Sequence, residues 1–422
     1  MNTIDVWREF QNNIQHVGII GPFDGEIRFS YDSNYRGEAI SVSLPLSQSP
    51  HSARATSCFF SGLIPEGSAL ETFSRMFHAG KEEFIPYLQH LNNESLGALL
   101  FSINGDAPYI APSYKPIETN FLNEFALKPF ETAVQTMNKT RLSLTGAMAK
   151  IGLYLDEEKN EWFYPFGGAP STHIIKAANS KQFPLETINE ALCLGIARRC
   201  DFPAAECSLI SVKEGDPLLA VRRFDRIISE SSKEIDGMPA PIRIHQEDFS
   251  QATSNPLKYE PTDGFYLPLI SSATRQHCQN AFGESNLLVE YVLFDYLIGN
   301  CDNHLKNFAL LYNQDWNDRE IAPLYDVIST VAYPNIYLEM GVSFGGDRRI
   351  DHVSRSLFQE TMRKCAIPSK LALGNLQNLA EAIPSAIREE AEAITEAGFP
   401  QVSKLVGPLL KGVITRAEAI LG

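Results

Sequence analysis

The sequence has no long uninterrupted apolar segment. Its longest strongly apolar stretch, Leu287 to Ile298, carries Glu290 and Asp295. It also falls short of the roughly 18 apolar residues that indicate a membrane span. Met1 to Glu9 is polar and acidic, whereas a signal peptide has an apolar core. We therefore expect a soluble cytoplasmic protein with no membrane partner.

Closely paired cysteines are also missing. The seven cysteines include no C-x-x-C pair. Cys193, Cys200 and Cys207 are spaced by seven residues, which matches no usual interval between metal ligands. Free cysteines are among the most often buried residues. The odd number of cysteines also fits a reducing compartment, so we expect buried, reduced thiols.

The chain has no excess of positive charge. Its net charge is −15 and its pI is about 5.1. Tight direct binding to nucleic acid needs a basic footprint, so the composition disfavours it. A local basic patch, or contact with DNA through a basic partner, remains open.

The composition is that of an ordinary globular protein. The 422 residues are 44% hydrophobic and 21% charged, enough for two or three domains with a sizeable core. No internal repeat is visible. We expect boundaries that divide the chain into residues 1–115, 116–249 and 250–422. Asn104 to Thr119 is rich in proline and turn residues and is typical of a linker.

Short strands dominate the first two regions. Gly25 to Tyr31 and Ala39 to Leu44 alternate in polarity and predict strands, and helical patterns follow around Cys58 to Leu63 and Phe84 to Leu91. The second region has one good helix, Glu186 to Arg199. Its predicted strands are Leu142 to Thr145, Lys150 to Leu155, Trp162 to Tyr164, Thr172 to Lys176, Leu218 to Phe224 and Pro241 to His245.

The third region is mostly helical. Leu287 to Gly299 predicts a buried helix, and a small hairpin of Phe308 to Tyr312 and Ile321 to Tyr325 follows. Ser385 to Ala397 has helical periodicity, with Gly398 placed to end the helix. A small β-rich lobe followed by a helical lobe is a kinase-like layout, although layout alone says little about function.

The most informative stretch is Asp302-Asn-His-Leu-Lys-Asn307, followed by Asp326. Phosphoryl transfer needs a carboxylate to orient the attacking hydroxyl and oxygen ligands to hold metal and phosphates. The alternative is that these are ordinary surface-loop residues. Both aspartates stand beside apolar runs, however, and an unpaired buried carboxylate costs several kcal/mol. The pattern therefore favours a phosphotransfer site with a bound cation.

Three further features could either bind phosphate or be ordinary structural features. Lys306 could supply positive charge near the γ-phosphate or be a solvated loop lysine. Lys176 ends a predicted strand, where a kinase holds the α- and β-phosphates with a lysine, and Glu190 could pair with it or be an exposed helix charge. Ser143 to Lys150 has a central glycine between two predicted strands. This permits close approach to phosphates but is also unremarkable in a hairpin.

In combination these segments resemble one family, the HipA-type toxin serine/threonine kinases. Leu44-Pro45-Leu46 and Phe59 to Pro65 look like the N-terminal subdomain of that family. The other matching segments, in the family's order, are Ser143 to Lys150, Ser171 to Lys176, Arg223 to Arg226, Gln246 to Asp248, Asp302 to Asn307 and Tyr325-Asp326. The resemblance covers nearly the whole chain. It implies an α+β fold: a two-lobed kinase with a β-rich N-lobe, an all-helical C-lobe and an extra N-terminal α/β subdomain.

The resemblance also implies cofactors and residue roles. The cofactors would be ATP and Mg²⁺, with Asp302 as the catalytic base and Asn307 and Asp326 as the magnesium ligands. Backbone groups of Glu247 and Phe249 would form the hinge that bonds adenine. The other implied ATP contacts are Thr145, Gly146, Ala147, Met148, Ala149, Lys150, Lys176, His304, Lys306 and Tyr325. Thr145 to Lys150 would form the phosphate loop.

Regulation and partners follow from the same resemblance. Ser143 stands where the family carries a serine whose autophosphorylation expels the phosphate loop and silences the kinase. The implied partners are a helix-turn-helix antitoxin of HipB type, DNA only through that antitoxin, and a protein substrate such as an aminoacyl-tRNA synthetase. The chain departs from the better-known members at Met148-Ala149, where they carry Gln-Glu.

Two other functions stay open. Asp302-Asn-His with a downstream Asn and Asp also resembles the loops of small-molecule and lipid kinases. A pseudokinase that binds ATP and acts as a co-repressor beside a DNA-binding partner is the non-enzymatic alternative. The intact Asp302, Asn307, Asp326 and Lys176 argue against it.

Overall fold

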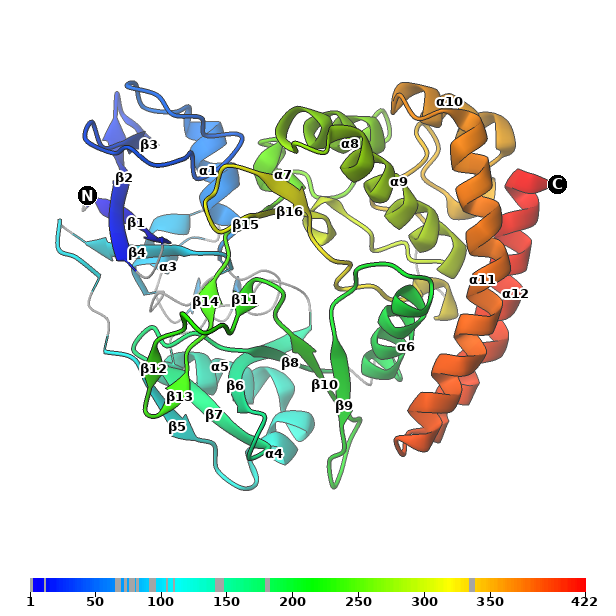
Figure 1. Ribbon diagram of the computed structural model, residues 1–422, viewed down its shortest axis with the longest axis horizontal. Helices are drawn as coiled ribbons and strands as arrows, with labels where there is room; N and C mark the ends of the chain where they lie inside the picture. The colour runs from blue at the N-terminus through cyan, green and yellow to red at the C-terminus, as the bar shows by residue number, and fades with distance from the viewer. Residues whose placement is uncertain are drawn as a thin grey trace. The chain divides into compact units, whose positions relative to one another are not determined.

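The fold is known from a computed structural model (Figure 1). It describes residues 3–10, 13–64, 70–71, 74–75, 80, 83–90, 96–103, 105–108, 111–140, 148–178, 183–333 and 338–422. The chain divides into two compact units. The first is Met1–Asn179, Ser208–Glu247 and Leu311–Asn317, and the second is Ser180–Cys207, Asp248–Leu310 and Asp318–Gly422. The predicted helix at Glu186 to Arg199 therefore groups with the C-terminal half of the chain.

The N-terminal part of the first unit is an antiparallel sheet with strand order β3-β2-β1-β4. Its strands are β1 (Ile4–Phe10), β2 (Asn13–Phe23), β3 (Glu26–Tyr31) and β4 (Leu99–Ile103). The helices α1 (Ala53–Ser61) and α3 (Phe84–His90) cover it. Phe29 and Phe59 are fully buried in the shared core. The strand expected at residues 39–44 is wrong, because only Ser41 and Leu44 form a bridge across a tight turn.

A second sheet of the same unit has strand order β5-β7-β6-β8-β10-β9. Its strands are β5 (Ser113–Pro116), β6 (Ala149–Asp156), β7 (Glu161–Phe166), β8 (His173–Ala177), β9 (Cys207–Ile210) and β10 (Leu218–Arg222). The strands predicted at residues 150–155, 162–164, 172–176 and 218–224 are confirmed with shifted ends. The strand predicted at residues 142–145 lies outside the described residues. Two helices that the sequence pattern did not predict, α4 (Phe121–Leu127) and α5 (Pro129–Thr140), add to the core of this sheet.

Short strands complete the first unit. β11 (Arg226–Ile227) pairs with β14 (Ile242–Arg243), so the strand predicted at residues 241–245 shrinks to two residues. β12 (Glu234–Ile235) pairs with β13 (Met238–Pro239) across Asp236-Gly237. Both turn residues have positive φ, 52° and 78°, as a tight hairpin requires. The chain then crosses into the second unit within β15 (Gln246–Asp248).

The second unit is mainly helical. Its helices are α6 (Glu186–Arg199), α7 (Phe249–Ala252), α8 (Tyr266–His277), α9 (Ala281–Ile298), α10 (Arg355–Lys364), α11 (Ser369–Glu396) and α12 (Ser403–Leu421). The helix predicted at residues 385–397 is confirmed, but it is only the end of α11, which begins before Pro384. Gly398 follows with φ of 100°. Figure 1 shows α11 and α12 side by side, and α11 also packs against α6 and α9.

The second unit also holds the predicted hairpin and short 3₁₀ helices. β16 (Ala309–Tyr312) begins in this unit and ends in the first, and β17 (Arg319–Ile321) returns to the second. The Ala322 N–H donates to the Ala309 carbonyl at 2.9 Å. The second strand therefore ends earlier than the predicted residues 321–325. The 3₁₀ helices are η1 (Leu305–Asn307), η2 (Thr330–Ala332), η3 (Ile350–His352) and η4 (Pro400–Val402).

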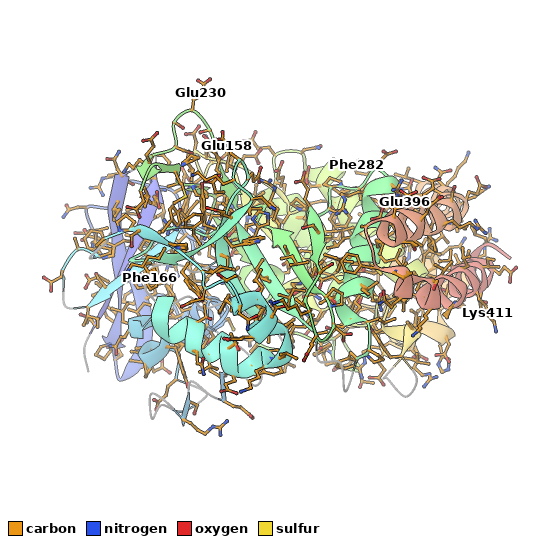
Figure 2. All side chains as sticks on the ribbon, turned by 90° about the horizontal axis from the view of Figure 1, so that it is seen from below. Glu158, Phe166, Glu230, Phe282, Glu396 and Lys411 are labelled. Atoms are coloured by element: carbon orange, nitrogen blue, oxygen red, sulfur yellow. The ribbon has the colours of Figure 1, made fainter. Side chains whose placement is uncertain are left out.

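Burial follows the sequence pattern in the helices. In α12, Leu409 and Val413 are buried, while Lys411 between them points away from the ribbon, as do Glu158 and Glu230 (Figure 2). The predicted buried helix is confirmed, since most residues of α9 from Leu288 onward are buried. None of the described helices is long and apolar enough to cross a lipid bilayer. All seven cysteines are described and free, four of them buried.

Candidate active site

The loop that carries Asp302 begins where α9 ends. Gly299 closes the helix in the left-handed conformation, with φ of 78°, which glycine adopts without strain. The Asp302 N–H donates to the Asn300 side-chain oxygen at 3.0 Å. The Asn307 side-chain amide donates to the Asp302 carbonyl at 2.8 Å. The structure therefore joins the two ends of the D-x-x-x-x-N segment by a hydrogen bond.

Tyr325 brings the segment with Asp326 to the same loop. Its hydroxyl donates to the carbonyl of Lys306, the neighbour of Asn307, at 2.7 Å. Burial raises the pKa of Tyr325 well above its usual value, and the charges of Asp248 and Asp326 add to this. The phenol therefore stays a neutral donor. Asp326 follows in the left-handed region with φ of 54°, a conformation that aspartate tolerates better than most residues.

The residues after Asp326 are fixed to the end of α9. The Ser329 hydroxyl donates to the Ile298 carbonyl at 2.7 Å. Asn189 of α6 binds the Ser329 backbone twice, donating to its carbonyl at 3.0 Å and accepting from its N–H at 3.1 Å. One helix end thus supports both the loop of Asp302 and the loop of Asp326. Nothing in the sequence around Asn189 had indicated this role.

Asn307 and Asp326 fit a magnesium ion by donor chemistry. The Asn307 amide nitrogen is used by Asp302, so its oxygen is the atom left for coordination. An amide oxygen and a carboxylate are ligands that Mg²⁺ takes, with water and phosphate completing the shell. Among the described residues no group of three or more His, Cys, Asp or Glu side chains is arranged to hold a metal ion. Such a group would not include the predicted pair, because Asn307 is not one of those residue types and Asp326 is a single carboxylate.

A buried carboxyl group, Asp295 of α9, is hydrogen-bonded to the loop that carries Asp302. Its oxygen accepts from the Asn300 side-chain amide at 2.9 Å. Asn300 in turn accepts from the Asp302 N–H. Desolvation raises the pKa of Asp295 to about 8, although Asn300 and Asn303 act in the opposite direction. The sequence pattern had marked Asp295 only as a charge within an apolar run.

The two lysines predicted to bind phosphate lie opposite each other in the first unit. Lys150 of β6 is in register with Lys176 of β8, and directly paired residues project from the same face of a sheet. Lys176 is buried. Of the predicted phosphate loop, Met148, Ala149 and Lys150 are described. Ser143, Thr145, Gly146 and Ala147 lie outside the described residues.

Both predicted hinge residues, Glu247 and Phe249, already make hydrogen bonds within the protein. The buried Glu247 carboxylate accepts from the hydroxyls of Ser41 and Tyr312, both at 2.5 Å, and from the Val42 N–H at 2.9 Å. This side chain therefore supports the first unit. The Phe249 N–H donates to the Phe308 carbonyl at 3.1 Å. A bond from this N–H to adenine stays a prediction and would require the amide to be shared or released.

The predicted ion pair of Lys176 with Glu190 and the predicted ATP contacts of His304 and Lys306 stay predictions. Glu190 is buried on α6 in the second unit, whereas Lys176 belongs to the first. His304 is buried, and its backbone carbonyl accepts from the Asn307 N–H at 2.9 Å. Lys306 lies within η1. The structure thus assembles Asp302, Lys306, Asn307 and Tyr325-Asp326 inside one unit.

The Arg223 to Arg226 segment forms a buried ionic network. Asp225 accepts from the guanidinium groups of Arg223 and Arg226, each at 2.7 Å. It also accepts from the Gly97 N–H and from the Gln246 side chain, each at 3.1 Å. Burial alone would raise the pKa of Asp225, but the two guanidinium groups outweigh it and hold that pKa well below its usual range. The network is a structural link between distant segments of the first unit.

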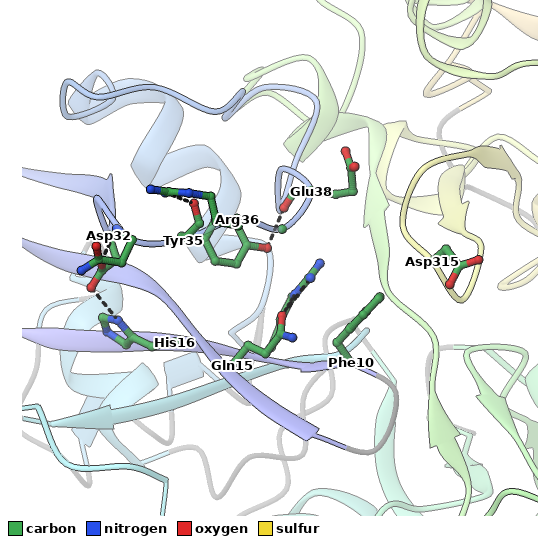
Figure 3. Close-up of a pocket in the computed structure, with 11 residues that line it drawn as sticks. Phe10, Gln15, His16, Asp32, Tyr35, Arg36, Glu38 and Asp315 are labelled. Carbon is green, nitrogen blue, oxygen red and sulfur yellow. Dashed lines mark hydrogen bonds and ion pairs between the residues drawn. The ribbon is translucent and has the colours of Figure 1, made fainter.

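A pocket of about 520 Å³ is lined by other residues of the first unit, at its N-terminal sheet (Figure 3). Several of its polar lining groups are hydrogen-bonded to neighbouring residues. Arg8 donates to the Gln15 side-chain oxygen at 3.0 and 2.9 Å. His16 lies between Asp5 and Asp32, at 3.0 and 3.2 Å. Arg8 Nη1 is buried without a hydrogen-bond partner among the described residues, so the lining groups satisfy one another only in part.

The fold is that of a kinase-like protein. It matches the solved complex of the Shewanella oneidensis toxin–antitoxin proteins HipA and HipB with operator DNA, with a TM-score of 0.81 and 21% identity over 99% of this chain and 97% of that chain. The family model described as the HipA-like C-terminal domain matches residues 142–387, and the HipA N-terminal domain model matches residues 10–102. The chain belongs to the HipA family.

Two relatives resemble nearly the whole chain. One is the serine/threonine-protein kinase toxin HipA of Shewanella oneidensis, 24% identical over 86% of this chain and 83% of its own length. The other is Y4mE of Sinorhizobium fredii, named as a candidate kinase, 28% identical over 89% of this chain and 90% of its own length. The expected family and the expected α+β kinase-like fold are therefore confirmed.

Proposed function

We propose that the chain is an ATP- and magnesium-dependent serine/threonine protein kinase that acts as the toxin of a toxin–antitoxin pair. The observation that carries this is the joined loop: Asp302 bonded to Asn307, with Tyr325-Asp326 attached to the same turn. This is the set of groups that phosphoryl transfer requires. Kinase and toxin appear in the names of its relatives.

Each residue has a role in the proposed reaction. Asp302 accepts the proton of the substrate hydroxyl as the oxygen bonds to the γ-phosphorus of ATP and ADP departs. Asn307 and Asp326 would hold Mg²⁺, which would supply charge neutralisation at the phosphates. Lys150 and Lys176 would face the phosphates.

Partners follow from the relatives. The solved HipA structure contains HipB and operator DNA, so we propose a HipB-type helix-turn-helix antitoxin for this chain. DNA contact would come through that antitoxin, which suits a net charge of −15. The substrate would be a translation component such as an aminoacyl-tRNA synthetase, modified in the cytoplasm.

The test compares the parent protein with Asp302→Ala in a cell lysate containing labelled ATP. We expect label on protein with the parent and none with the variant, because the acceptor hydroxyl then has no base. Lys370→Ala, a change at an exposed residue of α11, serves as a control that keeps activity. Label confined to metabolites or lipids would instead support a small-molecule or lipid kinase.

Expression in cells separates the toxin from a pseudokinase. Asp302→Ala should relieve growth arrest while the protein still accumulates and folds. Equal toxicity of parent and variant would reject phosphotransfer as the cause and favour the co-repressor alternative.

A further inference from the structure

Tyr259 contacts the proposed catalytic base directly. Its hydroxyl donates to Asp302 Oδ1 at 2.5 Å. The ring lies edge-on to His304, with centroids 5.0 Å apart and planes at 84°. Its exposed fraction is nonetheless 43%. Because an exposed side chain can adopt several rotamers, the question is what holds Tyr259 beside Asp302.

The backbone on both sides of Tyr259 supplies that reason. The Lys258 carbonyl accepts from the Leu305 N–H at 3.0 Å, which joins this segment to the catalytic loop. On the other side, the Glu260 N–H donates to the Gly341 carbonyl at 3.0 Å. The Tyr259 side chain therefore projects from a segment that is anchored at both neighbours.

Glu260 strengthens this anchor. Its carboxylate is buried and accepts from the backbone N–H groups of Tyr266 at 2.9 Å and Ser343 at 2.7 Å. Hydrogen bonds to a charged group are among the stronger ones in proteins. The phenol is consequently held beside Asp302 by the fold of the second unit rather than by a chance side-chain rotamer.

The Asp302 backbone is fixed as well. Its N–H donates to Asn300 and its carbonyl accepts from Asn307. Only the two side-chain torsions of Asp302 are left to vary, and the bond from Tyr259 restrains both. A carboxylate has two oxygens and about four acceptor positions, so one oxygen can be held by the phenol while the other stays available for a reacting hydroxyl.

We propose that Tyr259 is a positioning residue for phosphotransfer: it holds one oxygen of Asp302 and so directs the other toward the acceptor hydroxyl. This inference rests on the proposed kinase function. Orientation of a general base within a narrow angular range contributes strongly to rate, and small misplacements are costly. If the phenol instead competed with the acceptor hydroxyl for Asp302, removing it would raise the rate of phosphotransfer.

The experiment compares full-length parent, Tyr259→Phe and the control Tyr35→Phe. Tyr35 also donates one phenol hydrogen bond, to the Glu38 carbonyl at 2.7 Å, but it lies in the other unit. The probes are Mg-ATP with dephosphorylated casein and, separately, binding of a non-hydrolysable Mg-ATP analogue. Phosphotransfer by the parent to casein or to itself tests the proposed function first.

We expect Tyr259→Phe to lower kcat by about tenfold, with KM for ATP, affinity for the analogue and thermal unfolding like those of Tyr35→Phe. An unchanged kcat overturns the positioning role, and an increased kcat shows that the phenol competes with the acceptor. A matching loss of analogue binding would make Tyr259 part of the nucleotide site and also overturn the proposal. An inactive parent would overturn the proposed function itself, and the inference with it.

Discussion

At the scale of single residues, Asp302 shows how neighbours can immobilise a side chain on a loop. Asn300 and Asn307 bind its backbone, and Tyr259 binds its carboxylate. Asparagine is suited to this task because its amide both donates and accepts. The carboxylate that we propose as the catalytic base is therefore oriented before any ligand arrives, as catalysis by orientation would require.

Asp295 predicts an unusual pH dependence of stability. Burial raises the pKa of Asp295 to about 8, so the folded protein keeps a proton that the unfolded chain loses above about pH 4. Stability from this group is complete at low pH and falls as the pH rises toward 8. Asp295→Asn removes the titration and keeps an oxygen acceptor for Asn300. We expect the melting temperature of the variant to gain on the parent between about pH 5 and about pH 8. Melting curves at both pH values check this, and a constant difference would contradict it.

We expect autophosphorylation of Ser143 to inactivate the kinase. A phosphate adds close to two negative charges at neutral pH, which would repel the phosphates of ATP if Ser143 adjoins the phosphate loop. Intact-mass measurement after incubation with Mg-ATP should show one added phosphate on the parent and none on Ser143→Ala. The variant should also remain active for longer. An unchanged parent mass would remove this regulation and leave the kinase assignment standing.

At the scale of elements, the segment of Gly341 and Val342 holds the loop that carries Asp302. The Gly341 N–H donates to the Cys301 carbonyl at 3.1 Å, and the Gly341 carbonyl accepts from Glu260. The Asn303 side chain accepts from the same Gly341 N–H at 2.9 Å and donates to the Val342 carbonyl at 3.1 Å. The loop thus has a fixed shape although it lacks regular secondary structure over most of its length.

Gly341→Ala should disturb that shape. A Cβ at Gly341 would lie 2.8 Å from both Cα and N of His304. Because these are backbone atoms, the loop itself would have to move. We expect a loss of about 1–3 kcal/mol in the free energy of unfolding and a clear loss of phosphotransfer. Gly374→Ala on α11, where a Cβ would meet nothing within 4 Å, should be neutral or stabilising. Equal behaviour of the two variants in urea unfolding would contradict this account.

Elements also show where prediction from pattern succeeded. Glu186 to Arg199 was predicted with its true ends, and β6, β7 and β8 were predicted within two residues because alternation and turn residues marked them. Residues 39–44 alternate too, but there Glu247 accepts from the Ser41 hydroxyl and the Val42 N–H. The Glu247 carboxylate, about 200 residues away in the chain, thus binds donors of a tight turn, and the segment does not form a strand. A tertiary contact of this kind cannot be seen in a local window.

At the scale of the whole molecule, the first unit is assembled from segments far apart in the chain. Asp225 connects several of them, since it accepts from Gly97, from Gln246 and from two arginines nearby in sequence. A buried charge with all its partners present is tolerated, but removing one partner leaves an uncompensated charge. This makes Asp225 a sensitive point for the stability of the unit.

Asp225→Asn should therefore destabilise the protein by about 3–5 kcal/mol, because Arg223 and Arg226 would remain buried without their counter-charge. Glu157→Gln is the matched control. It neutralises an exposed carboxylate that pairs with Arg222, and we expect its cost to be below about 1 kcal/mol. Urea unfolding of the full chain measures both. Similar midpoints for the two variants would show that the network contributes little.

The sequence by itself determined the family, the kinase-like fold and the spacing of Asp302, Asn307 and Asp326, because these depend on local periodicity and on short ordered motifs. Only the tertiary structure decided what holds those residues: Asn189, Tyr259, Asp295 and Gly341 come from other elements. The bond from Asn300 to Asp295 spans only five residues of the chain, but the bonds made by Asn189, Tyr259 and Gly341 join positions tens to more than a hundred residues apart. Such contacts form only when distant segments pack together, and no local pattern encodes which partners will meet.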